Sequence, residues 1–128
     1  MKHIQRIFLL CTIPVLMSFM LGQPLRRVMR KYPSGKEHVV LYFDSETGDM
    51  LKEEVYFENG RVQWSGDYKN GVEDGTWTFY YESGRVKVSE TYSNGKEHGL
   101  RTEYDSSGRK VKEEQWKHGK LMKETRFQ

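Results

Sequence analysis

Aromatic residues and glycines recur with a fixed period through most of this chain of 128 residues. An aromatic residue stands at every twelfth position, in the order Tyr56, Tyr68, Tyr80, Tyr92, Tyr104 and Trp116. Glycines keep the same step in two series, Gly60, Gly84 and Gly108, and Gly71, Gly95 and Gly119. Such self-similarity indicates a repeat architecture, in which each unit packs mainly on its neighbours. We predict half-repeats of 12 residues that alternate between two kinds.

Each half-repeat is typical of a strand followed by a tight turn. The turn dipeptides are Asn59-Gly60, Asn70-Gly71, Ser83-Gly84, Asn94-Gly95, Ser107-Gly108 and His118-Gly119. Glycine supplies the positive φ that short hairpin loops need. Between the turns, residue types alternate with period two, as in strands with unlike faces. We expect strands near residues 38–43, 50–57, 61–68, 76–81, 85–92, 99–104, 109–116 and 120–127.

The alternation also predicts which side chains share a face of the sheet. We expect Trp77, Phe79 and Tyr81 on one face and Thr78 and Tyr80 on the other. By the same rule, residues two positions apart in one strand lie on the same face of the sheet. The valines and aromatic residues of the adjacent strands follow this rule in two sets, Val62, Trp64, Gly66 and Tyr68, and Val86, Val88, Glu90 and Tyr92.

These patterns predict an all-β fold: an elongated antiparallel β-meander of repeated hairpins, forming a single-layer sheet over residues 36–128. The chain contains no alanine, and only 36% of its residues are hydrophobic. Helical bundles favour alanine and leucine, so this composition argues against one, and against a thick α/β enzyme core. A meander leaves free edge strands, which would allow self-association unless charges such as Lys120, Lys123 and Arg126 protect the last strand.

The N-terminal segment indicates export. Lys2 and Arg6 precede an apolar run from Ile7 to Leu21, the pattern of a signal peptide. We expect residues 1–22 to be a signal peptide or an uncleaved membrane anchor, residues 23–35 a basic linker, and the protein to lie in the periplasm or cell envelope. Cys11 is the only cysteine and lies within the apolar run, so the remaining chain can form no disulfide.

A basic cluster follows the apolar run. Its members are Arg26, Arg27, Arg30 and Lys31. Cations beside a membrane attract anionic lipid headgroups, so the cluster is a candidate lipid contact, or simply a solvated linker. The net charge of +3 falls to +1 without Lys2 and Arg6, which argues against a nucleic-acid partner.

The residue pattern suggests no catalytic, cofactor or metal site. His38, His98 and His118 belong to turns that we expect to lie apart along the array, whereas a metal site needs converging ligands. The paired carboxylates Glu53 and Glu54 would face opposite ways in a strand. We therefore expect no enzymatic activity and no cofactor.

A ladder of large rings is the candidate interaction surface. It comprises Trp64, Trp77, Tyr80, Tyr92 and Trp116. Tryptophan and tyrosine dominate interface hot spots, so the ladder could bind a partner. The rings could equally be the packing of the sheet itself, and for Trp77 we expect packing.

Two segments carry a resemblance to a known family. The run from Gly75 to Gly84, with the turn at Tyr92-Ser93-Asn94-Gly95, resembles the MORN-repeat variant of bacterial proteins, often labelled antitoxin-like after the YwqK family. The run from Lys96 to Leu100 is similar to that family's glycine-lysine turn. The first unit departs from the pattern, because Val39 replaces the glycine.

The resemblance implies a β-hairpin array used for binding or scaffolding, with associations to membrane surfaces and self-association. We therefore expect an exported, non-enzymatic β-repeat protein that binds or scaffolds an unidentified protein partner. The alternatives are an antitoxin-like or immunity-like protein that neutralises a toxin, and a peripheral binder of anionic membrane surfaces.

Overall fold

The computed structural model describes residues 22–128 as one antiparallel sheet of ten strands, with no helix in this range. The strands are β1 (Leu25–Lys31), β2 (Glu37–Phe43), β3 (Met50–Tyr56), β4 (Val62–Lys69), β5 (Val72–Tyr80), β6 (Val86–Ser93), β7 (Lys96–Glu97), β8 (Gly99–Tyr104), β9 (Lys110–Lys117) and β10 (Lys120–Arg126). This confirms the predicted all-β meander. The predicted signal or anchor falls on residues outside those described.

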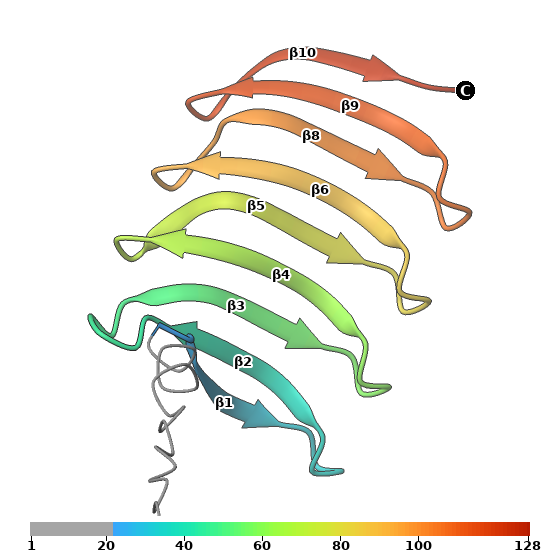
Figure 1. Cartoon of the computed structure of the whole chain (residues 1–128). Helices are drawn as coiled ribbons and strands as arrows, with labels where there is room; N and C mark the ends of the chain where they lie inside the picture. Colours follow the sequence, from blue (N-terminus) through green and yellow to red (C-terminus); the bar gives the residue numbers. More distant parts are fainter. Residues whose placement is uncertain (1–21) are drawn as a thin grey trace, which may run out of the picture.

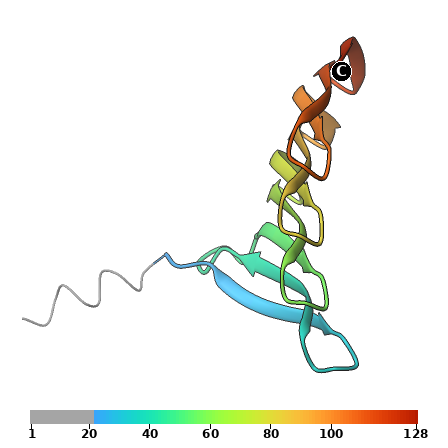
Figure 2. The ribbon, with the colours of Figure 1, turned by 90° about the vertical axis from the view of Figure 1, so that its right-hand side faces the viewer.

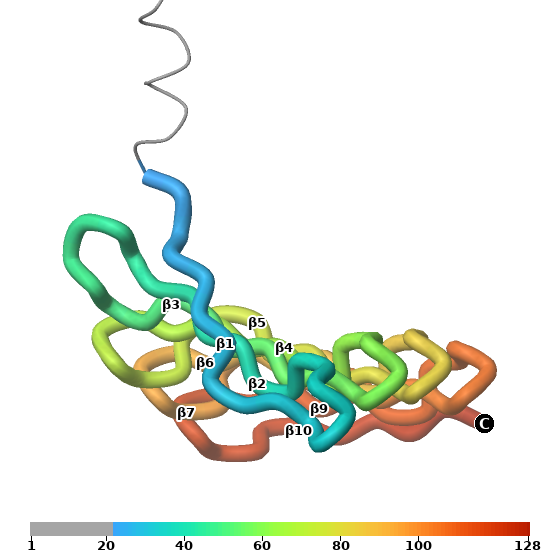
Figure 3. The backbone as a smooth tube through the Cα atoms, turned by 90° about the horizontal axis from the view of Figure 1, so that it is seen from below, coloured from blue at the N-terminus to red at the C-terminus, as the bar shows by residue number. Residues whose placement is uncertain are grey.

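The strands follow one another in chain order across the sheet (Figure 1). The short strand β7 pairs with β6 and leads directly into β8, which continues along the same neighbour. Seen edge-on, the sheet is a single layer, and no other element of residues 22–128 covers either side (Figure 2). The view along the stack shows each hairpin displaced from the one before, as the twist of a sheet requires (Figure 3).

Strand β1 corrects the expected linker. Residues Leu25–Lys31 pair with β2, with Arg26 opposite Tyr42 and Val28 opposite Val40. The segment contains no glycine or proline to interrupt a strand, and β2 offers it a row of backbone partners along its edge. Its charges masked this pairing in the sequence, because basic residues are typical both of linkers and of edge strands.

The turns at one edge of the sheet form a hydrogen-bonded stack. Asn70, Asn94 and His118 have φ of 52°, 50° and 50°, each followed by a glycine with positive φ. Two consecutive positive values are the signature of the type I′ hairpin turn. The amides of Gly95 and Gly119 then donate to the carbonyls of Glu73 and Glu97 in the preceding hairpin, both at 2.8 Å.

The turns at the opposite edge are linked by basic side chains. The cation just after each turn donates to a carbonyl of the next turn along the array. These bonds are Lys36 to Glu58 (2.9 Å), Arg61 to Glu82 (3.1 Å) and Arg85 to Ser106 (2.8 Å). Each hairpin is thus tied to its neighbour at both edges, beyond the ladder of the sheet itself.

A repeated β-bulge corrects one part of the predicted face assignment. Phe79 lies opposite Val88, but the next pair is Tyr80 with Val86, so Lys87 is the extra residue. Directly opposed residues point to the same side, so Val86 shares the face of Tyr80 and not that of Val88. The same shift places Tyr56 opposite Val62.

The apolar core is thin. Among residues 22–128, Val40 and Val55 are the only buried hydrophobic side chains, with 0% and 7% exposure. Three polar side chains are as deeply placed, those of Glu90, Thr102 and Glu114. Stability therefore depends on rings and paired charges that cover each other across neighbouring strands. No helix of these residues is long and apolar enough to cross a membrane.

Candidate interaction surface

An aromatic cluster occupies the middle of one face of the sheet. It consists of Trp64, Tyr68, Trp77, Phe79 and Tyr92, from β4, β5 and β6. The rings of Trp64 and Trp77 are stacked, with centroids 5.3 Å apart and an angle of 16°. Tyr68 and Tyr92 flank Trp77 at 5.4 and 5.7 Å. Trp77 is therefore the centre of the cluster.

Trp77 lies directly over a glycine. A Cβ atom on Gly66 would come within 2.3 Å of the Trp77 ring, so only glycine leaves room for it. The indole Nε1 donates to the Asp67 carbonyl at 3.2 Å, which satisfies its polar atom. The ring is thus packed on three rings, a glycine and a backbone acceptor, which supports the expected packing role for Trp77.

A charged cluster occupies the same face one repeat later. It consists of Glu90, Arg101, Glu103, Lys112 and Glu114. The Arg101 guanidinium lies 3.0 Å from Glu90 and 2.9 Å from Glu114, and it also pairs with Glu103. Lys112 lies 2.9 Å from both Glu103 and Glu114. The two cations and three carboxylates thus form one network of ion pairs across β6, β8 and β9.

The contacts of Glu114 shift its titration. Burial works to raise the pKa of this carboxyl, but hydrogen bonds from Lys112, Trp116 and Arg101 outweigh it and lower the pKa to about 2. A carboxylate that accepts several hydrogen bonds holds its charge to low pH. Glu114 is thus ionised at neutral pH, and its ion pairs with Arg101 and Lys112 join β8 and β9.

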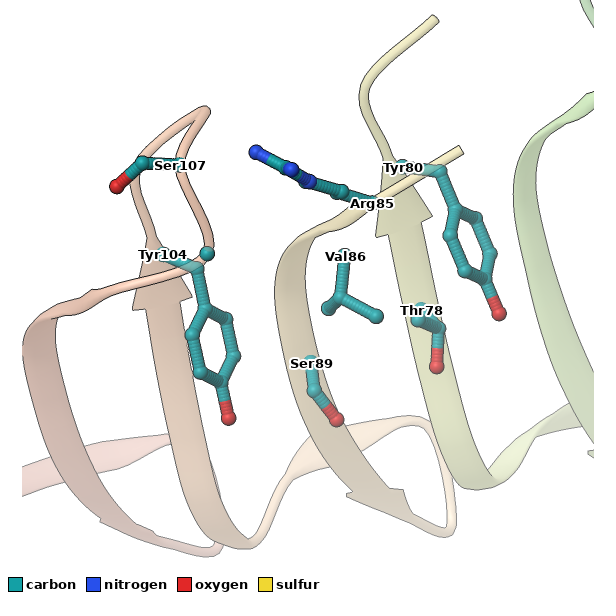
Figure 4. Close-up of a pocket in the computed structure, with 8 residues that line it drawn as sticks. Thr78, Tyr80, Arg85, Val86, Ser89, Tyr104 and Ser107 are labelled. Carbon is teal, nitrogen blue, oxygen red and sulfur yellow. The ribbon is translucent and has the colours of Figure 1, made fainter. Parts of the chain in front are cut away.

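The opposite face carries a hollow of about 690 Å³ between β5, β6 and β8. We call it the tyrosine hollow. Its lining residues are Thr78, Tyr80, Arg85, Val86, Ser89, Tyr104, Ser107 and Gly108. Figure 4 shows the rings of Tyr80 and Tyr104 on the two sides of Val86, with their hydroxyls pointing the same way. The bulge after Phe79 is what brings Val86 between them.

The predicted aromatic ladder is therefore split. Trp64, Trp77 and Tyr92 come together in the aromatic cluster, whereas Tyr80 lies on the other face in the tyrosine hollow. Trp116 lies near the end of the array, where its Nε1 donates to Glu114 at 3.2 Å. Sequence reasoning missed Tyr104, although its 24-residue spacing from Tyr80 was visible.

The basic cluster does not form one cationic face. The Arg26 guanidinium is bonded to Glu37, with Nη1 3.0 Å from its Oε1. The Arg27 guanidinium lies 5.2 Å above the Phe43 ring. Arg26 and Arg27 are consecutive in β1, and consecutive strand residues face opposite ways. Arg30 and Lys31 are exposed near the end of the strand, at an irregular part of the register.

Two histidines that we expected to lie apart are neighbours. The rings of His98 and His118 have centroids 4.6 Å apart, and the His118 amide donates to His98 Nδ1 at 3.4 Å. The stacked turns cause this, because the Gly119 amide bonds to the Glu97 carbonyl and so brings residue 118 beside residue 98. In residues 22–128, no three acidic, histidine or cysteine side chains are grouped to hold a metal ion.

The hairpin of β5 and β6 contributes to both the aromatic cluster, through Trp77 on one face, and the tyrosine hollow, through Tyr80 on the other. Comparison of the chain with curated proteins gives no match. A family model gives one: residues 73–94, which span most of this hairpin, match the MORN repeat variant.

Proposed function

We propose that this protein is a β-repeat protein-binding module that holds a partner on an open face of its sheet. The observation that supports the proposal is the single layer: within residues 22–128 all ten strands belong to one sheet, and no second layer of strands or helices lies on either face (Figure 2). The match of residues 73–94 to a MORN repeat variant is consistent with a binding role. The mutual pairing of the groups in the charged cluster supports a binding role for this protein over a catalytic one.

Site-specific photo-crosslinking in the full chain tests this role. A benzophenone amino acid replaces Ser107 at the rim of the tyrosine hollow or, as a matched control, Lys87, which lies beside Phe79 and Val88 on the other face. A binding module should give one discrete adduct from one position only. Equal labelling of many proteins from both positions, or none from either, would contradict the proposal.

We further propose that the protein works outside the cytoplasm. The support is the pattern of Lys2, Arg6 and the apolar run from Ile7 to Leu21. A full-chain fusion to a reporter that is active only after export should give signal, and the same fusion with two lysines in place of Leu9 and Leu10 should not. An intact but silent wild-type fusion would show that the protein stays inside.

The antitoxin-like alternative would use the same open faces, and the crosslinked adduct would then be a toxin. The membrane alternative is less well supported, because two of its four candidate cations are occupied by Glu37 and Phe43.

A further inference from the structure

One tyrosine recurs at the same register in three successive hairpins. Tyr56, Tyr80 and Tyr104 each lie just after a bulge, opposite the residue that opens the next strand. They belong to β3, β5 and β8, so one strand separates each from the next. Neighbouring strands lie about 4.8 Å apart, which sets a step of about 9.5 Å between successive rings. The face therefore carries a regular row of rings that runs across the strands.

Tyr80 and Tyr104 differ from the other tyrosines in their hydroxyls. Within residues 22–128, every other tyrosine hydroxyl donates a hydrogen bond to the protein, namely those of Tyr32, Tyr42, Tyr56, Tyr68, Tyr81 and Tyr92. Those of Tyr80 and Tyr104 have no protein partner in this range, and both rings line the tyrosine hollow. The hydroxyls of Thr78 and Ser89 at its floor are also without a protein partner among these residues. The hollow thus presents donors and ring faces to a ligand.

One charged side chain adds selectivity to the hollow. Arg85 lines its rim, and its Nη1 donates to the Ser106 carbonyl at 2.8 Å. That bond uses one of five N–H donors of the guanidinium and fixes its position at the rim. The remaining donors suit a carboxylate, which guanidinium binds with two parallel hydrogen bonds. Figure 4 shows Arg85 extending over the hollow toward Ser107.

The polyproline II helix has the period that this row requires. It has three residues per turn and a rise of 3.1 Å per residue, so its pitch is about 9.3 Å, close to the step of about 9.5 Å between the rings. Its carbonyls make no internal hydrogen bonds and are free to accept from tyrosine hydroxyls. Aromatic-lined grooves bind such segments because the extended conformation is preformed.

We propose that the tyrosine hollow binds a proline-rich segment of a partner protein in the polyproline II conformation. The segment lies across β5, β6 and β8, with prolines three residues apart on Tyr80 and Tyr104 and an acidic side chain at Arg85. This site rests on the proposed binding role and names its ligand.

A peptide titration on the full chain tests the site. The probe is a fluorescein-labelled 12-residue peptide, with the length chosen to span about four turns of polyproline II. It has proline at every third position and one terminal aspartate. Anisotropy should show saturable binding with a Kd below about 1 mM. A peptide of the same composition whose four prolines stand two residues apart should bind at least about fivefold more weakly, since no two of its prolines are three residues apart to match the step of the rings.

Variants separate the parts of the site. Tyr80→Phe and Tyr104→Phe should each weaken binding by about fivefold, the value of one hydrogen bond. Arg85→Gln should weaken binding of the aspartate peptide but not of its asparagine counterpart. Tyr68→Phe on the other face is the matched control and should leave binding unchanged. Melting temperatures of all variants show that the fold is retained.

Two results would overturn the site. These are equal affinity for the two proline spacings and absence of peptide binding up to about 1 mM. If a discrete crosslinked partner is still found, the binding role stands and only this ligand is wrong. If no discrete adduct forms either, both proposals fail.

Discussion

At the scale of single residues, two repeats fill the same place on the sheet in different ways. In one repeat Trp77 covers Gly66, and 24 residues later the equivalent positions hold Arg101 and Glu90. A ring on a glycine and a guanidinium between carboxylates both cover the same area of backbone. A sheet without a second layer needs such cover, because it has almost no apolar interior.

The packing of Trp77 leads to a first prediction. Trp77→Ala should lower the free energy of unfolding by about 3 kcal/mol, because it removes the ring on which three others pack. Trp116→Ala should cost less, about 1 kcal/mol, because that ring lies near the end of the array and loses one hydrogen bond. Urea denaturation of both variants measures the difference, and equal losses would contradict the central role of Trp77.

The charge of Glu114 leads to a second prediction. Its pKa in the folded protein is about 2, below the ordinary value of 4.5, so ionised Glu114 stabilises the fold. This stabilisation is complete above about pH 4.5 and is lost as the pH falls toward 2. Glu114→Gln should therefore flatten the fall of stability across this window, measured as the urea midpoint against pH.

Its matched control is Glu113→Gln. Glu113 is the preceding residue of β9 and pairs with the exposed Lys110 on the other face. The Glu113→Gln variant should show the same fall of the urea midpoint at acid pH as the wild-type protein. An unchanged curve for Glu114→Gln would show that another group causes the loss of stability in acid.

At the scale of elements, the turns tie one hairpin to the next through repeated side-chain bonds. Tyr32 and Tyr81 begin equivalent turns, and their hydroxyls donate to the carbonyls of Tyr56 and Tyr104 at 2.8 Å. Phe57 begins the intervening turn in the same geometry, with its amide bonded to the Arg61 carbonyl as that of Tyr81 is to Arg85. A phenylalanine has no hydroxyl to donate to the next hairpin.

This gap leads to a third prediction. Phe57→Tyr should stabilise the protein by about 1 kcal/mol, since its new hydroxyl would reach the Tyr80 carbonyl. Tyr81→Phe is the opposite change and should destabilise by a similar amount. Thermal unfolding measures both. If the two changes move the melting temperature in the same direction, the bonds between turns do not couple the hairpins as we infer.

At the scale of the whole molecule, each hairpin of residues 22–128 contacts mainly its neighbours along the array. Strands β4, β5 and β6 have partners on both sides, whereas β1 and β10 each pair along one edge only among the residues that the structure describes. In such arrays stability is the sum of unit and interface contributions, so the ends open first. Exposed apolar side chains gather at these ends, including Met29, Met122 and Phe127.

This arrangement leads to a fourth prediction. Hydrogen exchange of the full chain, followed by mass spectrometry, should show the slowest amides in β4 to β6 and the fastest in β10. The gradient should survive Trp116→Ala and collapse in Trp77→Ala, which weakens the middle of the array. Uniform protection over all ten strands would instead indicate one cooperative unit.

The sequence alone determined the period, the turns and the fold class. These follow from local rules: an asparagine-glycine pair favours the positive φ of a tight turn, and alternation indicates a strand without reference to its partners. For this reason eight strands and their antiparallel order were predictable from positions such as Gly60, Gly71 and Tyr56.

Only the tertiary structure decided what depends on neighbouring strands. A bulge shifts Val86 to the face of Tyr80, a free edge recruits the basic segment as β1, and stacked turns bring His98 to His118. Each is set by hydrogen bonds between segments far apart in the chain, which a local pattern does not contain. The tyrosine hollow belongs to this second class, since it exists only because that bulge places Val86 between two rings of one face.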